Sequence, residues 1–415
     1  MVDIDLSVTI NGVFYPNPLI VASGPSTLNS NAIMKCFESS AGGVVTKTIT
    51  YDPTQQSQPK PRMYVIGKRE VFAGRFYSLY SVDLMSEYKP ERWVRFIRDV
   101  KREMRRRGIS GGLIASIAGR SYDEWGKLAA MMGDAGADAI ELNLSCPHIE
   151  GDELMGRAAV RSPEAIRSII EAVKENSSLP VIGKLTPHGA NLLELARLMV
   201  SAGADSLVST ARFQGLVVDV ETLRAVSWGG FGGYGGPWQL PISLSWTAKI
   251  AGENLGVPVI GSGGVSLGED IARFILVGAE AAQCCTAIML MGREIIPKMI
   301  MGLKDWMDRH GFTKISDFKG LVLKSIIGLE DLNRRRVYRL SVTEKCTGCG
   351  LCIKACPYDA IRLNPSGRAE VNLRRCDNCG LCASLCPAEA IICAPRKMPH
   401  ARGASLQPRG AKIRC

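Results

Sequence analysis

The chain has 415 residues, 46% of them hydrophobic, and its 51 Lys and Arg exceed its 40 Asp and Glu to give a net charge of +11. This length predicts one large domain and a smaller one. No apolar run approaches the ~20 residues needed to span a bilayer, and the N-terminus lacks the basic start and apolar stretch of a secretory signal. We therefore expect a cytoplasmic protein that is not bound to a membrane.

The positive charge is concentrated at one end of the chain. Residues 334–415 carry 16 Lys and Arg against 5 Asp and Glu, whereas residues 1–333 carry 35 of each. A basic segment indicates a negatively charged partner. An anionic cofactor in the same segment would meet that need, so the charge does not require nucleic acid.

Short β-branched runs alternate with helical patterns over the first 330 residues. Eight of them predict strands, at residues 18–22, 43–48, 113–117, 139–144, 181–185, 206–209, 259–261 and 281–285. Two helices have clear ends: Pro90–Arg107 starts at a proline and stops before Gly108, and Ser162 with Pro163 opens another. The alternation predicts an α/β protein with a (β/α)8 (TIM) barrel.

Two connections are too long to be simple turns. Residues 51–89 and 212–240 each follow a predicted strand, so both should lie over the C-terminal face, where barrels collect their chemistry. The second contains a glycine-rich run from Trp228 to Trp238. That run predicts either a flexible lid or a backbone that closely approaches a ligand.

The composition changes after residue 333, and fourteen cysteines in all indicate metal or redox chemistry. Eight of them form the pattern Cys-x2-Cys-x2-Cys-x3-Cys-Pro twice, between residues 346 and 387. We therefore predict the barrel in residues 1–333 and a ferredoxin-like domain in residues 334–395. Residues 396–415 form a basic tail that we expect to be poorly ordered or ordered by a partner.

In this tandem pattern, three cysteines bind one [4Fe-4S] cluster and the fourth binds the neighbouring cluster. The predicted ligand sets are Cys346, Cys349, Cys352 and Cys386 for one cluster, and Cys376, Cys379, Cys382 and Cys356 for the other. Structural zinc is the alternative, but zinc sites use two separated Cys-x2-Cys arms. Two adjacent clusters pass electrons one at a time, so a group in the barrel must exchange electrons with them.

A flavin would connect the clusters to an organic substrate, because it accepts single electrons and exchanges hydride. Gly261–Gly264 follows the seventh predicted strand, and Cys285 with Thr286 ends the eighth, where barrels bind phosphate through backbone amides. Lys47 and Lys184 end two further strands, and a buried lysine needs an anionic partner such as reduced flavin. A glycine-rich turn alone would be weak evidence for a bound flavin, and a single lysine could instead extend its ammonium to solvent.

The fourth predicted strand runs into Asn143, Ser145, Cys146 and His148. An amide, a hydroxyl, a thiol and an imidazole at the C-terminal end of a barrel strand predict reacting groups. Cysteine has an unperturbed pKa of about 8.5, so a neutral thiol can donate a proton near pH 7. A structural cysteine is the alternative when this stretch is taken alone.

Together these features resemble the dihydropyrimidine dehydrogenase family over residues 4–395. The motifs that carry the resemblance are Lys47-Thr48, Asn143 to Pro147, Lys184 to Pro187, Phe231 to Gly236, Gly263-Gly264 and the tandem cysteine pattern. The barrel alone is similar to class 1 dihydroorotate dehydrogenases, which lack this cluster domain on the same chain.

The resemblance implies reduction of a ring C=C bond, or the reverse reaction. Hydride would pass through N5 of FMN, and Cys146 would exchange a proton from the opposite face, with Ser145 and His148 tuning or relaying it. The residues that the resemblance implies for FMN binding are Ser23, Lys47, Thr48, Asn143, Lys184, Thr210, Gly236, Ser262, Gly263, Gly264, Cys285 and Thr286.

The residues around the expected substrate depart from the family pattern. Ser81 occupies the position of a family asparagine, and Ala211 with Arg212 replaces an Asn-Thr pair, while Asn143 is kept. The implied substrate contacts are Ser81, Asn143, Ser145, Ala211 and Arg212. Loss of ring-amide partners can change selectivity by orders of magnitude. The alternative substrate is therefore a non-pyrimidine whose anionic group pairs with Arg212, unless that side chain points outward.

No Gly-x-Gly-x-x-Gly dinucleotide site follows a predicted strand. We therefore expect a separate FAD/NAD(P)H-binding subunit or a ferredoxin as the electron partner, guided by the basic C-terminal domain, and an oligomeric protein. The competing prediction is a non-catalytic iron-sulfur electron carrier.

Overall fold

The computed structural model describes residues 4–67, 77–144, 162–188, 191–332 and 338–395. The chain divides into two compact units, Met1–Ile326 and Ile327–Cys415. A search of the described residues found no helix with the length and apolar character that a membrane crossing requires.

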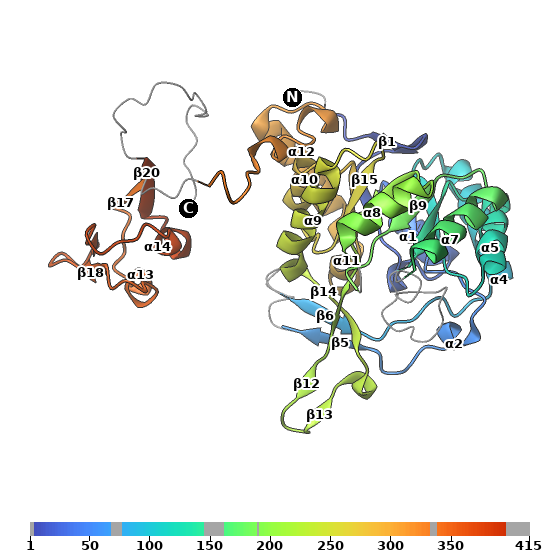
Figure 1. The fold of residues 1–415 in the computed structure, drawn as a ribbon, viewed down its shortest axis with the longest axis horizontal. Coiled ribbons are helices and arrows are strands. Elements are labelled where there is room, and N and C mark those ends of the chain that lie inside the picture. The colour runs from blue at the N-terminus through green and yellow to red at the C-terminus, as the bar shows by residue number, and fades with distance from the viewer. Residues whose placement is uncertain (1–3, 68–76, 145–161, 189–190, 333–337, 396–415) are drawn as a thin grey trace. The chain divides into compact units, whose positions relative to one another are not determined.

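The first unit is built on a closed parallel barrel, so the predicted fold is confirmed (Figure 1). Its strands in chain order are β3 (Leu19–Val21), β4 (Gly43–Val45), β7 (Gly112–Ile117), β8 (Ala139–Asn143), β9 (Val181–Lys184), β10 (Ser206–Val208), β15 (Val259–Ser262) and β16 (Ala281–Cys284). All eight predicted strands are present, and β16 pairs with β3 to close the barrel. Most barrel-strand residues are fully buried, as expected when helices cover a parallel sheet.

Helices surround this barrel. They are α1 (Ser30–Glu38), α2 (Pro53–Gln56), α4 (Pro90–Arg107), α5 (Tyr122–Ala135), α7 (Pro163–Asn176), α8 (Leu192–Ser201), α9 (Leu240–Gly252), α10 (Gly268–Leu276), α11 (Thr286–Met291) and α12 (Ile295–His310). The predicted ends of α4 are confirmed: Gly108 follows it in the left-handed conformation, with φ of 64°. At the start of α7, the hydroxyl of Ser162 accepts the Ala165 amide at 3.1 Å.

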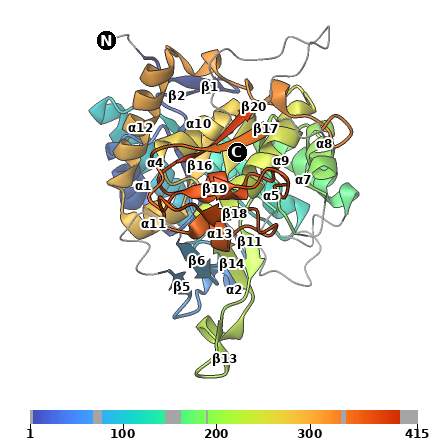
Figure 2. The ribbon, with the colours of Figure 1, turned by 90° about the vertical axis from the view of Figure 1, so that its left-hand side faces the viewer.

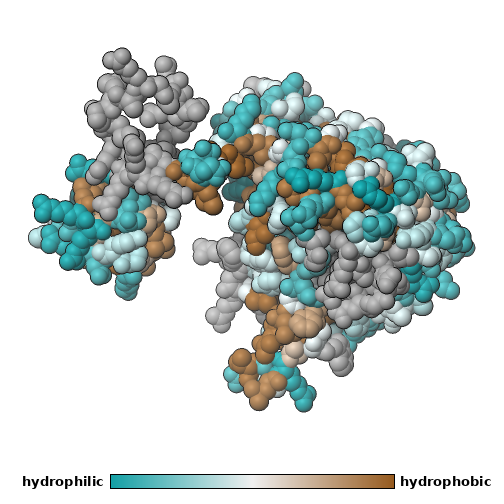
Figure 3. Space-filling model, viewed as in Figure 1, coloured by the Kyte–Doolittle hydropathy of each residue, from teal (hydrophilic) through white to brown (hydrophobic). Residues whose placement is uncertain are grey.

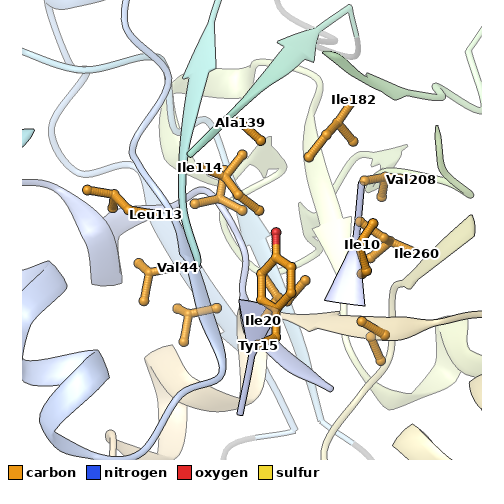
Figure 4. Packing of buried hydrophobic residues seen from close by; sticks show 14 of the residues in the cluster. Ile10, Tyr15, Ile20, Val44, Leu113, Ile114, Ala139, Ile182, Val208 and Ile260 are labelled. Carbon is orange, nitrogen blue, oxygen red and sulfur yellow. The ribbon is translucent and has the colours of Figure 1, made fainter. Parts of the chain in front are cut away.

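A short hairpin closes the N-terminal end of the barrel. Its strands are β1 (Val8–Ile10) and β2 (Val13–Tyr15). The Tyr15 ring lies against Gly43 and Gly112, the first residues of β4 and β7, where a Cβ atom would come within 2.7 Å of the ring. Figure 4 shows this ring among the aliphatic side chains that fill the barrel. With that end packed, the opposite, C-terminal end is left for a site.

The two long connections join in one antiparallel sheet beside the barrel. Its strands, in order across the sheet, are β11 (Phe213–Gly215), β14 (Gly232–Gly235), β6 (Ser78–Ser81) and β5 (Met63–Ile66). Between β11 and β14 a hairpin of β12 (Val218–Asp219) and β13 (Arg224–Ala225) projects away from the barrel (Figure 2). Its tip exposes apolar side chains among polar ones, with Val220 and Leu223 more than 70% exposed (Figure 3).

The second unit is small and has an internal repeat. Strands β17 (Tyr338–Val342) and β20 (Ile391–Pro395) pair antiparallel, as do β18 (Ile361–Leu363) and β19 (Ala369–Val371). Each cysteine run leads into a short helix, α13 (Leu351–Lys354) or α14 (Leu381–Leu385), and each helix is preceded by a glycine in the left-handed conformation. Besides the cysteines, its buried core contains only a few aliphatic side chains. A unit this small gains much of its stability from bound clusters or metals.

Candidate active site and cluster sites

A large cavity opens at the C-terminal end of the barrel and takes up about 1220 Å³ including its open mouth. It is lined by the last residues of β8, β9, β15 and β16 and by both long connections. Eleven of the twelve expected FMN residues line it: Ser23, Lys47, Thr48, Asn143, Lys184, Gly236, Ser262, Gly263, Gly264, Cys285 and Thr286. The twelfth, Thr210, is fully buried beside the cavity, and its hydroxyl donates to the carbonyl of Ala211.

The loop after β15 fits a phosphate group. Gly263 and Gly264 have φ of 102° and 90°, and a Cβ atom on Gly263 would lie 2.2 Å from Nε2 of Gln239. Only glycine fits both constraints, and it leaves the backbone amides accessible to an anion. Tyr77 also lines the cavity, and its phenol oxygen is buried near Ser266.

Lys184, at the end of β9, belongs to a buried polar triangle. Its ammonium donates to Oε1 of Glu141 at 3.2 Å and to Oε1 of Gln283 at 2.7 Å. The amide of Gln283 donates to Oε2 of Glu141 at 2.7 Å, which closes the triangle. Sequence reasoning missed Glu141 and Gln283. Strand alternation carried a signal for Glu141, because it shares a face of β8 with Asn143.

A chain of hydroxyl groups runs beside this triangle. Thr48 lies 3.0 Å from the Ser116 hydroxyl and 3.3 Å from that of Ser23, and it accepts a 2.9 Å hydrogen bond from the Asn143 amide. These contacts fix Asn143 at the end of β8. The predicted catalytic residues Ser145, Cys146 and His148 come shortly after Asn143 in the sequence and lie outside the described residues.

Lys47, at the other side of the cavity, forms a buried ion pair with Asp83. Arg62 also donates to Asp83, with 3.1 Å between Nε and Oδ1. Burial alone would raise the pKa of the Asp83 carboxyl, but Lys47, Arg212 and Arg62 together hold it below its usual value. For Lys47, burial is the largest influence and lowers the pKa of the ammonium despite the attraction of Asp83. Sequence reasoning missed Asp83, because a single carboxylate in a long connection gives no distinctive pattern.

Arg212 lines the cavity and does not point outward. Its Nη1 donates to the hydroxyl of Ser81 at 2.5 Å, and its backbone carbonyl accepts from the His188 ring at 3.0 Å. The guanidinium covers Gly233, where a Cβ atom would lie 2.6 Å from Cζ of Arg212. Within the described parts of the chain, no carboxylate pairs with Arg212, although both cavity lysines have one. Ser81, Asn143 and Ala211, also expected at the substrate, line the same cavity.

The second unit contains two small cavities, each bordered by four cysteines. Cys346, Cys349, Cys352 and Cys386 line one, and Cys356, Cys376, Cys379 and Cys382 line the other. Each set therefore takes three thiols from one run and the fourth from the other run. Among the described residues, no three His, Cys, Asp or Glu side chains are arranged to hold a single metal ion. Thiols grouped around a cavity suit a cluster better than one zinc ion.

Backbone amides point at several of these sulfurs in a repeated way. The amide of Ala360 donates to the sulfur of Cys356 at 3.4 Å, and the amide of Ala390 donates to that of Cys386 at 3.3 Å. In each run the donor comes four residues after the cysteine. Hydrogen bonds from backbone amides also lower the pKa of the Cys346 thiol. Amide donors stabilise the thiolate that a cluster needs and tune its reduction potential.

A barrel with a phosphate loop and two lysines at its C-terminal cavity, on the same chain as two sets of four thiols, defines a flavin- and iron-sulfur-dependent oxidoreductase. Comparison with known proteins narrows this class. Residues 5–307 match the family described as dihydroorotate dehydrogenase, and residues 345–390 match the 4Fe-4S dicluster domain. The chain belongs to the dihydroorotate dehydrogenase family.

Curated relatives cover most of the chain. It is 31% identical over 364 residues to the NAD-dependent dihydropyrimidine dehydrogenase subunit PreA of Escherichia coli, with 86% of each protein covered. It is 32% identical over 319 residues to the catalytic subunit of dihydroorotate dehydrogenase B of Pyrococcus abyssi, covering 77% of this chain and 99% of that subunit. It is also 28% identical to the chloroplastic dihydropyrimidine dehydrogenase of Arabidopsis thaliana over 80% of each protein.

These comparisons confirm the family resemblance drawn from the sequence. The chain is an oxidoreductase that acts on CH-CH groups, and its cofactors are FMN and [4Fe-4S] clusters.

Proposed function

We propose that this enzyme reduces, or forms, a C=C bond in a pyrimidine-like ring or a related unsaturated substrate that carries an anionic group, with Arg212 pairing with that group. The observation that carries this proposal is which side chains pair with the three cations that line the cavity. Lys47 pairs with Asp83 and Lys184 with Glu141, whereas Arg212 has only the Ser81 hydroxyl as a side-chain partner among the described residues. A cation at a ligand cavity without a directly paired carboxylate favours an anionic ligand.

FMN, when bound, supplies hydride exchange with the substrate and single-electron exchange with the clusters. The chain's own residues bind, orient and handle protons. Lys184 would hold a positive charge against the negative charge of the reduced cofactor. We propose that Cys146 exchanges the proton with the substrate carbon next to the one that exchanges hydride, and that Ser145 and His148 tune or relay this proton. Asn143, whose amide donates to Thr48, would position the substrate between the cofactor and Cys146.

A substrate profile tests the proposed anion preference. The dithionite-reduced holoenzyme is mixed with uracil or thymine, which are neutral pyrimidines, with orotate, an anionic pyrimidine, and with fumarate, an anionic compound without a ring. Flavin reoxidation is then followed by its absorbance. The proposal expects rapid reoxidation by one or both anionic compounds. Turnover of uracil or thymine at least as fast as that of every anionic compound would contradict it.

We also propose that the chain works with a separate electron partner, an FAD/NAD(P)H-binding subunit or a ferredoxin, in the cytoplasm. Two relatives support this because their names describe a subunit and a catalytic subunit. The positive charge of residues 334–415 would guide a negatively charged partner. Purified chain mixed with NADH should show no fast flavin reduction until the partner is added. Fast reduction by NADH alone would rule out the need for a partner.

A non-catalytic electron carrier is the alternative for this chain. Such a carrier has no need for a glycine loop that fits phosphate or for a substrate-sized cavity, and this chain has both. The substrate profile separates the two functions, because a carrier would leave all four compounds unchanged.

A further inference from the structure

Glu141 is a buried carboxylate to which the proposed chemistry gives no role. Its side chain is 1% exposed and reaches from β8 to Lys184 of the adjacent strand β9. Gln283 reaches the same two groups from β16, which is separated from β9 in the barrel by β10 and β15. The three side chains therefore join two sides of the barrel directly beneath the cavity that they line.

Every acceptor oxygen of this group is used within it. One oxygen of Glu141 accepts from Lys184, the other accepts from Gln283, and the Gln283 carbonyl accepts from Lys184. The ammonium has three donors, and only two are used among the described residues. The third remains for a ligand in the cavity. The group thus presents a donor to the cofactor while its own two charges cancel.

The other titratable groups around Lys184 do not replace Glu141 as a counter-charge. Tyr15 lies near Glu141. Burial, and to a smaller extent the nearby carboxylates, raises the pKa of its phenol, so the phenol stays neutral. Burial also raises the pKa of the Cys285 thiol. Across the cavity, Asp83 is paired with Lys47 and lies beside Arg212, which adds further positive charge. Glu141 alone lies within ion-pair distance of Lys184 in the described parts of the chain.

We propose that Glu141 and Gln283 are positioning residues that keep Lys184 protonated and oriented in both oxidation states of the bound cofactor. This inference rests on the proposed role of Lys184 at FMN. Two-electron reduction to the anionic form takes up one proton and adds one negative charge to the cofactor. Because Glu141 balances Lys184 before that charge arrives, Lys184 need not gain or lose a proton, and reduction requires only the one proton.

Removing the charge of Glu141 should change this proton count. In Glu141→Gln, Lys184 would be a buried ammonium without a counter-charge, which sheds its proton readily. The negative charge gained on reduction would bring that proton back. Reduction would then take up two protons for two electrons, and the midpoint potential of FMN would fall more steeply with pH by about 30 mV per pH unit.

The test is a mediated redox titration of flavin absorbance in the holoenzyme over the neutral pH range. Glu141→Gln should show the steeper slope. Lys184→Met should keep the wild-type slope, because a buried Glu141 without its partner is already protonated in the oxidised state and takes up no further proton on reduction. The double variant Glu141→Gln/Lys184→Met has neither charge and should return to the wild-type slope. Asp205→Asn is the matched control: Asp205 accepts the amide of Val181 at the other end of β9, and its loss should leave the slope unchanged.

A wild-type slope in FMN-loaded Glu141→Gln, or a steep slope in Lys184→Met or in the double variant, would overturn the proposal. If Glu141→Gln does not retain FMN, Lys184→Met still tests the proposal, because a steep slope there would show that a group other than Lys184 takes up the second proton. Gln283→Leu keeps both charges and should keep the wild-type slope while weakening FMN binding, measured by fluorescence. None of these readouts depends on the substrate, so failure here leaves the proposed anion preference untouched.

Discussion

Arg212 donates a 2.5 Å hydrogen bond to Ser81, a residue 131 positions earlier in the chain. The bond is made where β6 pairs with β14, in the sheet beside the barrel, and Gly233 of β14 lies opposite Ser81 in the register. Because glycine has no side chain there, the guanidinium can lie flat over the strand and remain at the cavity. Ser81 and Gly233, which are distant in sequence, thus hold the Arg212 cation where a substrate would bind.

Arg212→Met should weaken reaction with the anionic substrate and spare FMN binding. A hydrogen bond to a charged group contributes about 1.5–3 kcal/mol, so kcat/KM should fall about 10- to 100-fold, mainly through KM. Arg62→Met is the matched control, since Arg62 is a nearby cation that already pairs with Asp83. Steady-state kinetics of both variants check this. Equal losses of kcat/KM in the two variants would mean that the substrate responds to the overall positive charge of the cavity and not to a specific pairing with Arg212.

Gly233→Ala should displace the guanidinium without removing it. The new methyl group would lie 2.6 Å from Cζ of Arg212, so the side chain must move away from Ser81. We expect KM for the anionic substrate to rise by about tenfold, the equivalent of one weakened hydrogen bond. Gly230→Ala is the control in the same connection, because its methyl group would meet only Val82 at 3.6 Å. Similar KM values for the two variants would contradict this account of Gly233.

The fold was more predictable than the site. The eight barrel strands are short, mostly apolar segments buried on both faces and separated by helical patterns, and this local alternation is enough to identify them. The pairing of β6 with β14 has no local signature, because it joins two connections that the sequence presents as separate loops. The cavity lysines could be named from their strand ends, but sequence reasoning missed their side-chain partners Asp83, Glu141 and Gln283.

Double cysteine variants should reveal how the two runs share their clusters. Cys356 lines the same cavity as Cys376, and not that of its own run. Cys356→Ser/Cys376→Ser should therefore disrupt one ligand set and keep about half of the iron, whereas Cys356→Ser/Cys346→Ser should disrupt both sets. Iron analysis together with EPR of the reduced protein measures this. The opposite pattern would mean that each run binds its own cluster.

Asp83→Asn should reduce stability in a pH-dependent way. The folded-state pKa of Asp83 is held below its usual value, chiefly by Lys47 against the effect of burial, while in the unfolded chain it is about 3.9. Its contribution is therefore fully present above about pH 4 and is lost as the pH falls through the folded value. At neutral pH the variant leaves Lys47 buried without a partner, which should cost about 3–5 kcal/mol.

Urea unfolding of the full chain, followed by tryptophan fluorescence, measures this difference, because all six tryptophans lie before residue 327 and report on the barrel unit. The gap between wild type and Asp83→Asn should be largest near neutral pH and should shrink on acidification below about pH 4. Asp99→Asn is the matched control: its pair with Arg102 is exposed, so the free energy of unfolding should change by less than about 1 kcal/mol at any pH. A gap for Asp83→Asn that stays constant or widens in acid would show that the Asp83 carboxylate does not stabilise the cavity through its charge.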